Sequence, residues 1–203
     1  MSPSTIRICL LLPAVVLAAC AGGPGKEPAR FDLGAGAGDW RSPGFVLRTV
    51  EVQGPSWLGT PAIQYRLAYA EGTRRQAYAE SRWIAPPTEL LEQALKARVA
   101  ATESTRTDAG CRLRVDLDEF IQRFDTPTDS RLVVEARATL LAARGDSLLG
   151  RRAFAVAQPA PTPDARGAAA AAAAAVQAVT RDLNGGLAVL ARETPVIVER
   201  CRA

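Results

Sequence analysis

Histidine is absent from all 203 residues of the chain. It is the commonest general base in enzymes and the commonest side-chain ligand of transition metals. Its absence excludes catalysis by a serine–histidine or cysteine–histidine pair. The chain also lacks a glycine-rich phosphate loop, so we do not expect it to use ATP itself. The sequence predicts a protein that is not an enzyme and has no catalytic residues, no metal site and no cofactor.

A block of basic residues is also missing. Lysine occurs only at Lys26 and Lys96, and the 25 basic residues are mixed with 21 acidic ones, for a net charge of +4. Nucleic-acid-binding domains gather basic residues on one face or in one run, so we expect no nucleic-acid partner. Hydrophobic residues make up 48% of the chain and charged residues 23%, as in a folded globular domain.

The N-terminal segment has the pattern of a secretory signal. Arg7 supplies a positive charge, and residues 8–19 are apolar apart from one cysteine and one proline. This stretch is shorter than the roughly 20 residues that span a bilayer. It ends in Leu-Ala-Ala-Cys at 17–20, which resembles the lipobox of bacterial lipoproteins, whose cysteine becomes the lipidated N-terminus. The alternative is an ordinary signal peptide in which Cys20 has no role.

This motif divides the chain into three parts. We expect a signal peptide at 1–19, a lipidated N-terminus and flexible tether at 20–44, and one domain at 45–203. Two or more acyl chains hold a protein stably on a membrane. Ala21 follows the cysteine, where an aspartate would favour the inner membrane in enterobacteria. We therefore expect the protein on the periplasmic face of the outer membrane.

Two cysteines remain after processing. Cys9 leaves with the signal peptide and Cys20 takes the lipid, which leaves Cys111 and Cys201 in an oxidising compartment. The sequence predicts a disulfide between them, and the alternative is two buried free thiols.

Alternating apolar residues predict a series of strands. They cover residues 45–52, 63–69, 76–80, 111–124, 132–142 and 148–156. Within 111–124 the alternation slips by one residue at Glu119, which predicts a bulge. Val196 to Val198 is expected to add a last short strand.

Two segments have helical spacing. One begins at Pro86-Pro87-Thr88 and runs to Val99. The other covers 164–193, because its alanine-rich run favours helix and its apolar spacing continues through Gly185 and Gly186. The order of elements predicts an α+β domain, a largely antiparallel sheet with two helices packed on one face.

Four residues are candidates for contact with a partner. Trp57 and Leu58 lie in a Gly/Pro loop, where they form either an exposed anchor or a part of the core. Gln64 and Arg66 occupy the outward positions of a half-buried strand, a placement that also needs no partner. The aromatic residues Trp57, Tyr65, Tyr69 and Trp83 could line a lipid groove, although the core is the simpler place for Tyr65 and Trp83.

Acidic residues cluster along one predicted strand and its turn. Asp116, Asp118, Glu119 and Asp125 could form a metal or acid–base site. Because arginines alternate with them on the outward positions, we favour a solvated strand face.

Three groups of residues carry a family resemblance. They are the run Asp118 to Asp125 followed by Ser130 and Arg137 to Leu140, the run Ile63 to Arg66 followed by Trp83 and Pro86-Pro87, and the run Pro159 to Pro161 before the alanine-rich helix. In order and spacing they resemble the ABC-type transport auxiliary lipoproteins, a PqiC-like family, over about residues 31–190.

The resemblance implies a non-catalytic component of a lipid transport system. In such systems an inner-membrane ABC transporter works with MCE-domain proteins that bridge the periplasm, and the lipoprotein receives or positions the bridge at the outer membrane. The resemblance also allows a homo-oligomer. The alternative is a structural lipoprotein that supports an outer-membrane assembly, as the small lipopolysaccharide-assembly lipoprotein does.

Overall fold

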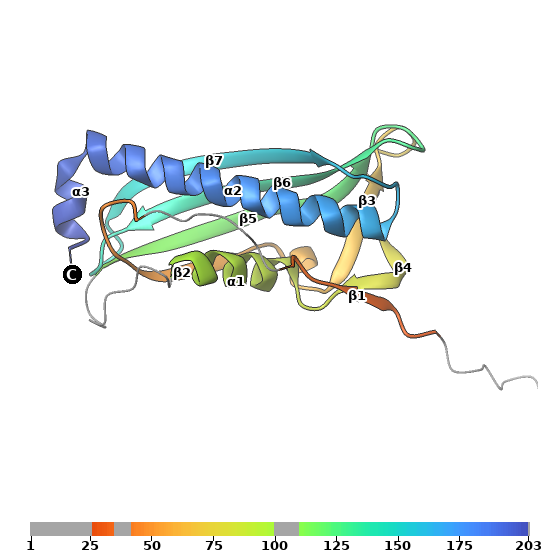
Figure 1. Ribbon diagram of the computed structural model, residues 1–203, viewed down its shortest axis with the longest axis horizontal. Helices are drawn as coiled ribbons and strands as arrows, with labels where there is room; N and C mark the ends of the chain where they lie inside the picture. The colour runs from red at the N-terminus through yellow and green to blue at the C-terminus, as the bar shows by residue number, and fades with distance from the viewer. Residues whose placement is uncertain (1–25, 35–41, 100–109, 203) are drawn as a thin grey trace, which may run out of the picture.

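The computed structural model describes residues 26–34, 42–99 and 110–202 (Figure 1). The predicted signal peptide and Cys20 lie outside these ranges. The elements are β1 Ala29–Phe31, β2 Leu47–Gln53, the 3-10 helix η1 Ser56–Leu58, β3 Ala62–Leu67, β4 Gln76–Trp83, α1 Pro87–Val99, β5 Cys111–Phe124, β6 Ser130–Leu141, β7 Leu148–Pro159, α2 Ala165–Glu193 and α3 Pro195–Arg200.

The strands form one sheet with β5 at its centre. The main path is β1-β4-β3-β5-β6-β7, and β2 also pairs with β5. β5, β6 and β7 form a long antiparallel meander, whereas β2 and β3 pair with β5 in parallel and β1 pairs with β4 in parallel. The predicted α+β class is confirmed, with a mixed sheet. β1 lies within the segment predicted as a tether.

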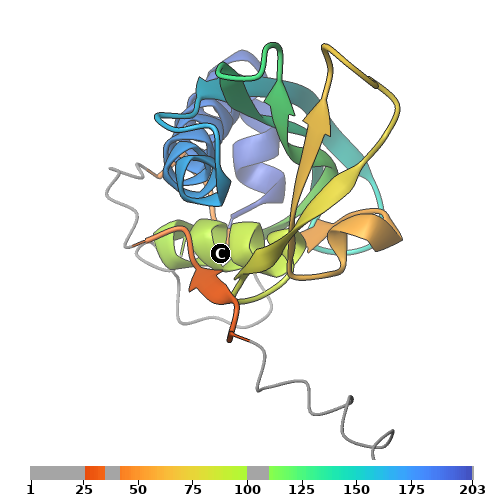
Figure 2. The same ribbon diagram turned by 90° about the vertical axis from the view of Figure 1, so that its right-hand side faces the viewer.

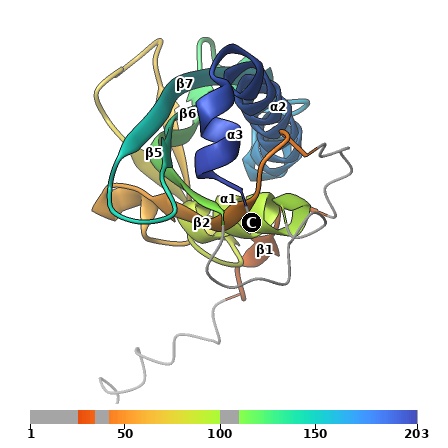
Figure 3. The ribbon, with the colours of Figure 1, turned by 90° about the vertical axis from the view of Figure 1, so that its left-hand side faces the viewer.

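Two helices cover one side of the curved sheet. α2 runs along the meander, and α1 lies beside β2 (Figures 1 and 3). No helix in the described part of the chain is both long and apolar enough to cross a membrane.

Small side chains let α2 pack closely on the sheet. Ala168, Ala172 and Ala175 are fully buried in its first half, and Leu183 and Leu187 continue the buried stripe in its second half. α2 runs unbroken through Gly185 and Gly186, as the apolar spacing predicts. Asp164 caps its start, because its carboxylate accepts a hydrogen bond from the Gly167 N–H at 2.8 Å.

The bulge that the sequence predicts is present in β5. The pairing of β5 with β6 shifts register between Leu117 and Glu119. Inward and outward positions therefore exchange at this point, and Phe120 joins the core beside Trp83, at 5.7 Å between ring centroids.

The C-terminal segment reaches the sheet by a different route from the one predicted. A disulfide joins Cys111 to Cys201, and both residues are completely buried. The strand predicted at 196–198 is wrong, because residues 195–200 form α3. Pro195 occupies the first turn of this helix, where its fixed φ and missing N–H are tolerated. Ile197 then packs into the core and Cys201 ends the helix.

Candidate partner-docking site

In the loop after β2, Trp57 is exposed and its neighbour Leu58 is buried. Both lie in η1, but Trp57 is 48% exposed and Leu58 is 0% exposed. Leu58 belongs to the core, so its prediction as a partner contact is corrected: the tight 3-10 turn points these neighbouring side chains in different directions. Trp57 alone presents a large aromatic surface here.

Gln64 is buried, contrary to the prediction that it faces outward. Only 8% of it is exposed. The loop carrying Trp57 folds over this part of β3, and the Gln64 amide donates to the Trp57 carbonyl oxygen at 2.6 Å. Gln64 therefore holds the loop in place and presents no free surface.

Arg75 and Glu119 complete the cluster. Sequence reasoning missed Arg75 and considered Glu119 only as a member of the acidic cluster. Arg75 donates from Nη1 to Glu119 Oε1 at 3.0 Å and from Nη2 to Oε2 at 2.8 Å. Nη1 also donates to Gln64 Oε1 at 2.7 Å, and the guanidinium lies 5.6 Å from the centroid of the Trp57 ring. A signal existed at Glu119, since a bulge often redirects a side chain at a functional position.

Arg66 lies on the other side of the same carboxylate. Its Nη2 is 3.5 Å from Glu119 Oε2, and its side chain is 27% exposed. Its Nε is buried and has no hydrogen-bond partner in the described part of the chain. We call Trp57, Gln64, Arg66, Arg75 and Glu119 the Trp57 site. It brings together three of the four predicted contact residues, of which Trp57 and Arg66 reach the surface.

Each acidic residue of the alternative site lies near an arginine. Arg137 makes two hydrogen bonds to Asp118, which hold the pKa of this carboxyl below its usual range. Arg114 is 3.8 Å from Asp116, and Asp125 pairs with two arginines. Among the described residues no three acidic or cysteine side chains converge as metal ligands would. The geometry favours the solvated strand face.

The aromatic residues do not form one groove. Trp83 is only 2% exposed and is part of the core. Tyr65 and Tyr78 stack on the opposite face of β3 and β4, at 4.7 Å between centroids. The Tyr78 hydroxyl donates to the fully buried Gln122 at 2.7 Å, and burial is the main cause that raises the pKa of Tyr78.

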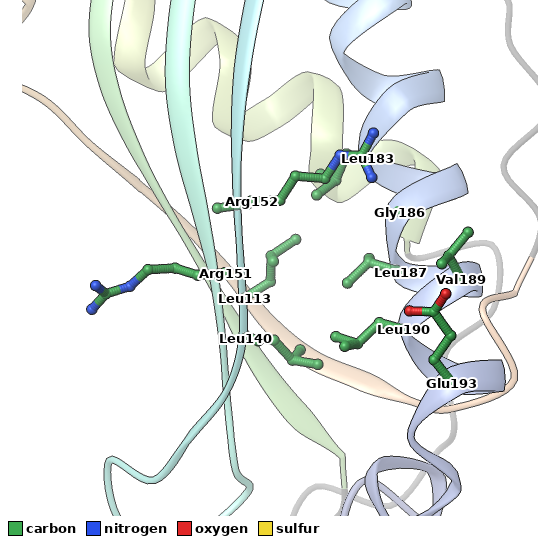
Figure 4. A pocket seen from close by; sticks show the side chains of 12 residues that line it. Leu113, Leu140, Arg151, Arg152, Leu183, Gly186, Leu187, Val189, Leu190 and Glu193 are labelled. Carbon is green, nitrogen blue, oxygen red and sulfur yellow. The ribbon is translucent and has the colours of Figure 1, made fainter.

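A separate pocket of about 190 Å³, partly open to solvent, lies between α2 and the meander (Figure 4). Its apolar lining includes Leu113, Leu140, Leu183, Leu187 and Leu190, and its charged lining consists of Arg151, Arg152 and Glu193.

The Trp57 site is suited to binding a surface. An exposed indole braced by a guanidinium, with a second arginine beside it, is a combination found at protein–protein hot spots. The site is built by the loop after β2, by β3, by the bulge of β5 and by the residue before β4. In Figure 2, β3 and β4 lie on the side of the molecule away from α2.

A family model matches the chain in sequence, and solved structures match it in fold. The family model of the ABC-type transport auxiliary lipoprotein component matches residues 35–184. No curated protein sequence matches the chain.

Solved structures share the fold. A crystal structure of a protein from Xanthomonas campestris, of the family DUF330, has a TM-score of 0.64 at 20% identity, with 85% of this chain and 92% of that chain covered. A crystal structure described only as an uncharacterized protein has a TM-score of 0.60 at 14% identity, with coverage of 79% and 99%. At these identities the likeness concerns the fold alone.

Proposed function

The chain belongs to the family of ABC-type transport auxiliary lipoprotein components, and from this premise we propose that it is a non-catalytic, outer-membrane-anchored component of an MCE-type lipid transport system. The observation that carries the proposal is the family match over residues 35–184, which spans most of the folded domain. In this role the protein binds the periplasmic MCE-domain protein.

The anchor in this proposal is a lipid on Cys20. Ala29, at the start of β1, lies nine positions after Cys20, a reach of about 30 Å when extended. The domain can then stand away from the bilayer and meet a partner. Mass spectrometry of the mature N-terminus should find an acylated cysteine, and Cys20→Ala should release the protein from membranes. A Cys20→Ala protein that stays with the membrane would remove the anchor from the proposal.

The docking surface in this proposal is the exposed part of the Trp57 site. Trp57 offers the aromatic anchor and Arg66 a charge beside it. Arg75 contacts the Trp57 ring and pairs with Glu119, and Glu119 also pairs with Arg66. Rigid aromatic and arginine side chains lose little entropy on binding, which favours them as anchors.

In-cell photo-crosslinking tests the partner. A crosslinking residue at Trp57 or Arg66 should capture an MCE-domain protein. One control places the same crosslinking residue at Tyr69, which is also 48% exposed but has no arginine stacked on its ring among the described residues. A second control places it at Val196 in α3, at the other end of the molecule (Figure 1). Crosslinks between two copies would report a homo-oligomer.

Loss of the gene should then impair lipid trafficking and outer-membrane permeability. Capture of an outer-membrane assembly protein in place of an MCE-domain protein would support the structural-lipoprotein alternative. Equal capture from Trp57 and Val196 would contradict the docking surface.

A further inference from the structure

Three arginines stand side by side across three neighbouring strands. Arg66 of β3 is paired in register with Arg123 of β5, and Arg123 with Arg131 of β6. Directly paired residues share one face of a sheet, so the three side chains lie on the same face. Arg75, immediately before β4, joins this row through its contact with Glu119. We call Arg75, Arg66, Arg123 and Arg131 the arginine row.

The four arginines of the row carry more positive charge than the neighbouring carboxylates neutralise. Glu119 pairs with Arg75 and Arg66, and Asp125 pairs with Arg123 and Arg131. Four guanidinium groups therefore share two carboxylates, which leaves two positive charges uncompensated. Burial alone would raise the pKa of Asp125, but hydrogen bonds from Arg123 and Arg131 hold it below its usual range. Asp125 is therefore ionised at neutral pH and already contributes its full negative charge.

This arrangement costs stability. Like charges directly opposite each other in a sheet repel, and Arg66 also keeps a buried Nε without a partner in the described residues. Arg123 and Arg131 remain 44% and 46% exposed at their side chains. The row thus has free donors that point to solvent from a rigid support.

The chemistry of the row specifies its ligand. Guanidinium groups bind carboxylates through paired N–H donors with fixed geometry. Trp57 adjoins the row through Arg75, and an aromatic anchor beside arginines is typical of a protein interface. Glu135 pairs in register with Glu119, four residues along the strands from Arg131 and Arg123, and bounds the positive surface on that side.

We propose that the arginine row binds an acidic segment of a partner polypeptide, whose carboxylates take the two uncompensated charges while an apolar side chain contacts Trp57. This inference rests on the proposed function for the identity of the partner but not for the chemistry of the surface. It predicts that the docking surface of the MCE-domain protein is acidic.

The test uses the full-length lipoprotein in nanodiscs of neutral phosphatidylcholine. The probe is a hexaglutamate peptide, with hexalysine as its charge control, and binding is followed by fluorescence anisotropy at low salt. Arg123→Gln combined with Arg131→Gln should weaken hexaglutamate binding about tenfold, because two solvent-exposed ion pairs together contribute on that scale. The matched control is Arg137→Gln with Arg151→Gln, which removes the same charge from residues outside the row.

Three outcomes overturn the proposal. They are failure of hexaglutamate to bind, equal loss in the row and control variants, and preferential binding of the row to phosphatidylglycerol vesicles, which would assign it to lipid headgroups. Failure of the MCE proposal looks different. Hexaglutamate would still bind through the row while crosslinking captures no MCE-domain protein. Circular dichroism and thermal melting of each variant establish that it is folded.

Discussion

Arg75 and Glu119 are 44 residues apart in sequence, yet they form two parallel hydrogen bonds at 3.0 and 2.8 Å. Glu119→Ala should lower the free energy of unfolding by about 1.5–3 kcal/mol, because hydrogen bonds to charged groups contribute on that scale and two arginines lose their carboxylate. Urea unfolding measures the loss. Asp118→Ala, one residue away at an exposed pair, should have a smaller effect. Equal losses would show that the Trp57 site depends little on Glu119.

The disulfide between Cys111 and Cys201 should be a main source of stability. It links residues 90 positions apart, and a loop of that size gives about 4–5 kcal/mol in the chain-entropy model, an upper estimate. Replacing both cysteines with alanine should cost about 2–5 kcal/mol in urea unfolding. Non-reducing peptide mapping should find the pair linked in periplasmic protein. Two free thiols there would contradict the disulfide.

The hydroxyl of Tyr78 supports a buried amide. Tyr78→Phe should cost about 1–3 kcal/mol, because it leaves the buried Gln122 Oε1 without its donor. Tyr65→Phe is the matched control, since its hydroxyl bonds to the partly exposed Gln76 and its loss should cost less. A similar loss in both variants would indicate that ring packing matters more than the hydrogen bond.

Tyr78 should also make stability depend on pH. Its pKa is raised by burial, so its contribution is fully present below the ordinary tyrosine pKa of about 10 and is lost as pH rises toward the folded value. The unfolding free energy should therefore fall more steeply between pH 9 and 11 in the natural protein than in Tyr78→Phe. Parallel curves would contradict this prediction.

Asp164 should stabilise α2 in a pH-dependent way. Hydrogen bonds, first from Thr162 and then from the Gly167 N–H, hold its pKa below the usual range. Its contribution is present above the unfolded aspartate pKa of about 3.9 and is lost as pH falls through the folded value. Asp164→Ala should cost about 1 kcal/mol at pH 7. Asp164→Asn, which keeps a capping oxygen, should cost less and remove the pH dependence.

The pocket under α2 offers a test of packing. Ala138→Val should raise the free energy of unfolding by about 1 kcal/mol, because it fills part of the space of about 190 Å³. Ala172→Val, at a fully buried position in the closely packed half of α2, should instead cost about 1–3 kcal/mol. Thermal melting compares the two. Destabilisation by Ala138→Val would show that the pocket cannot accept a methyl group in this direction.

The local pattern of apolar and polar residues predicts most of the secondary structure. The alternation in β5, its slip at Glu119 and the helical spacing through Gly185 and Gly186 are properties of neighbouring residues, so they can be read directly along the chain. The pairing of Cys111 with Cys201 followed from elimination, since the other two cysteines belong to the expected signal and anchor.

Only the tertiary structure decided which surfaces are free. The alternation along β3 predicts an outward position for Gln64, but the loop that follows β2 covers it. Leu58 is buried because the tight 3-10 helix η1 turns its side chain inward. Val196 to Val198 has strand-forming residues, yet Pro195 and the packing of Ile197 make the segment helical. The parallel pairing of β3 with β5 aligns Arg66 with Arg123, although all of β4 and α1 lies between them in the sequence. Register between distant strands depends on how the whole core packs, and that is why the arginine row becomes visible only in the folded molecule.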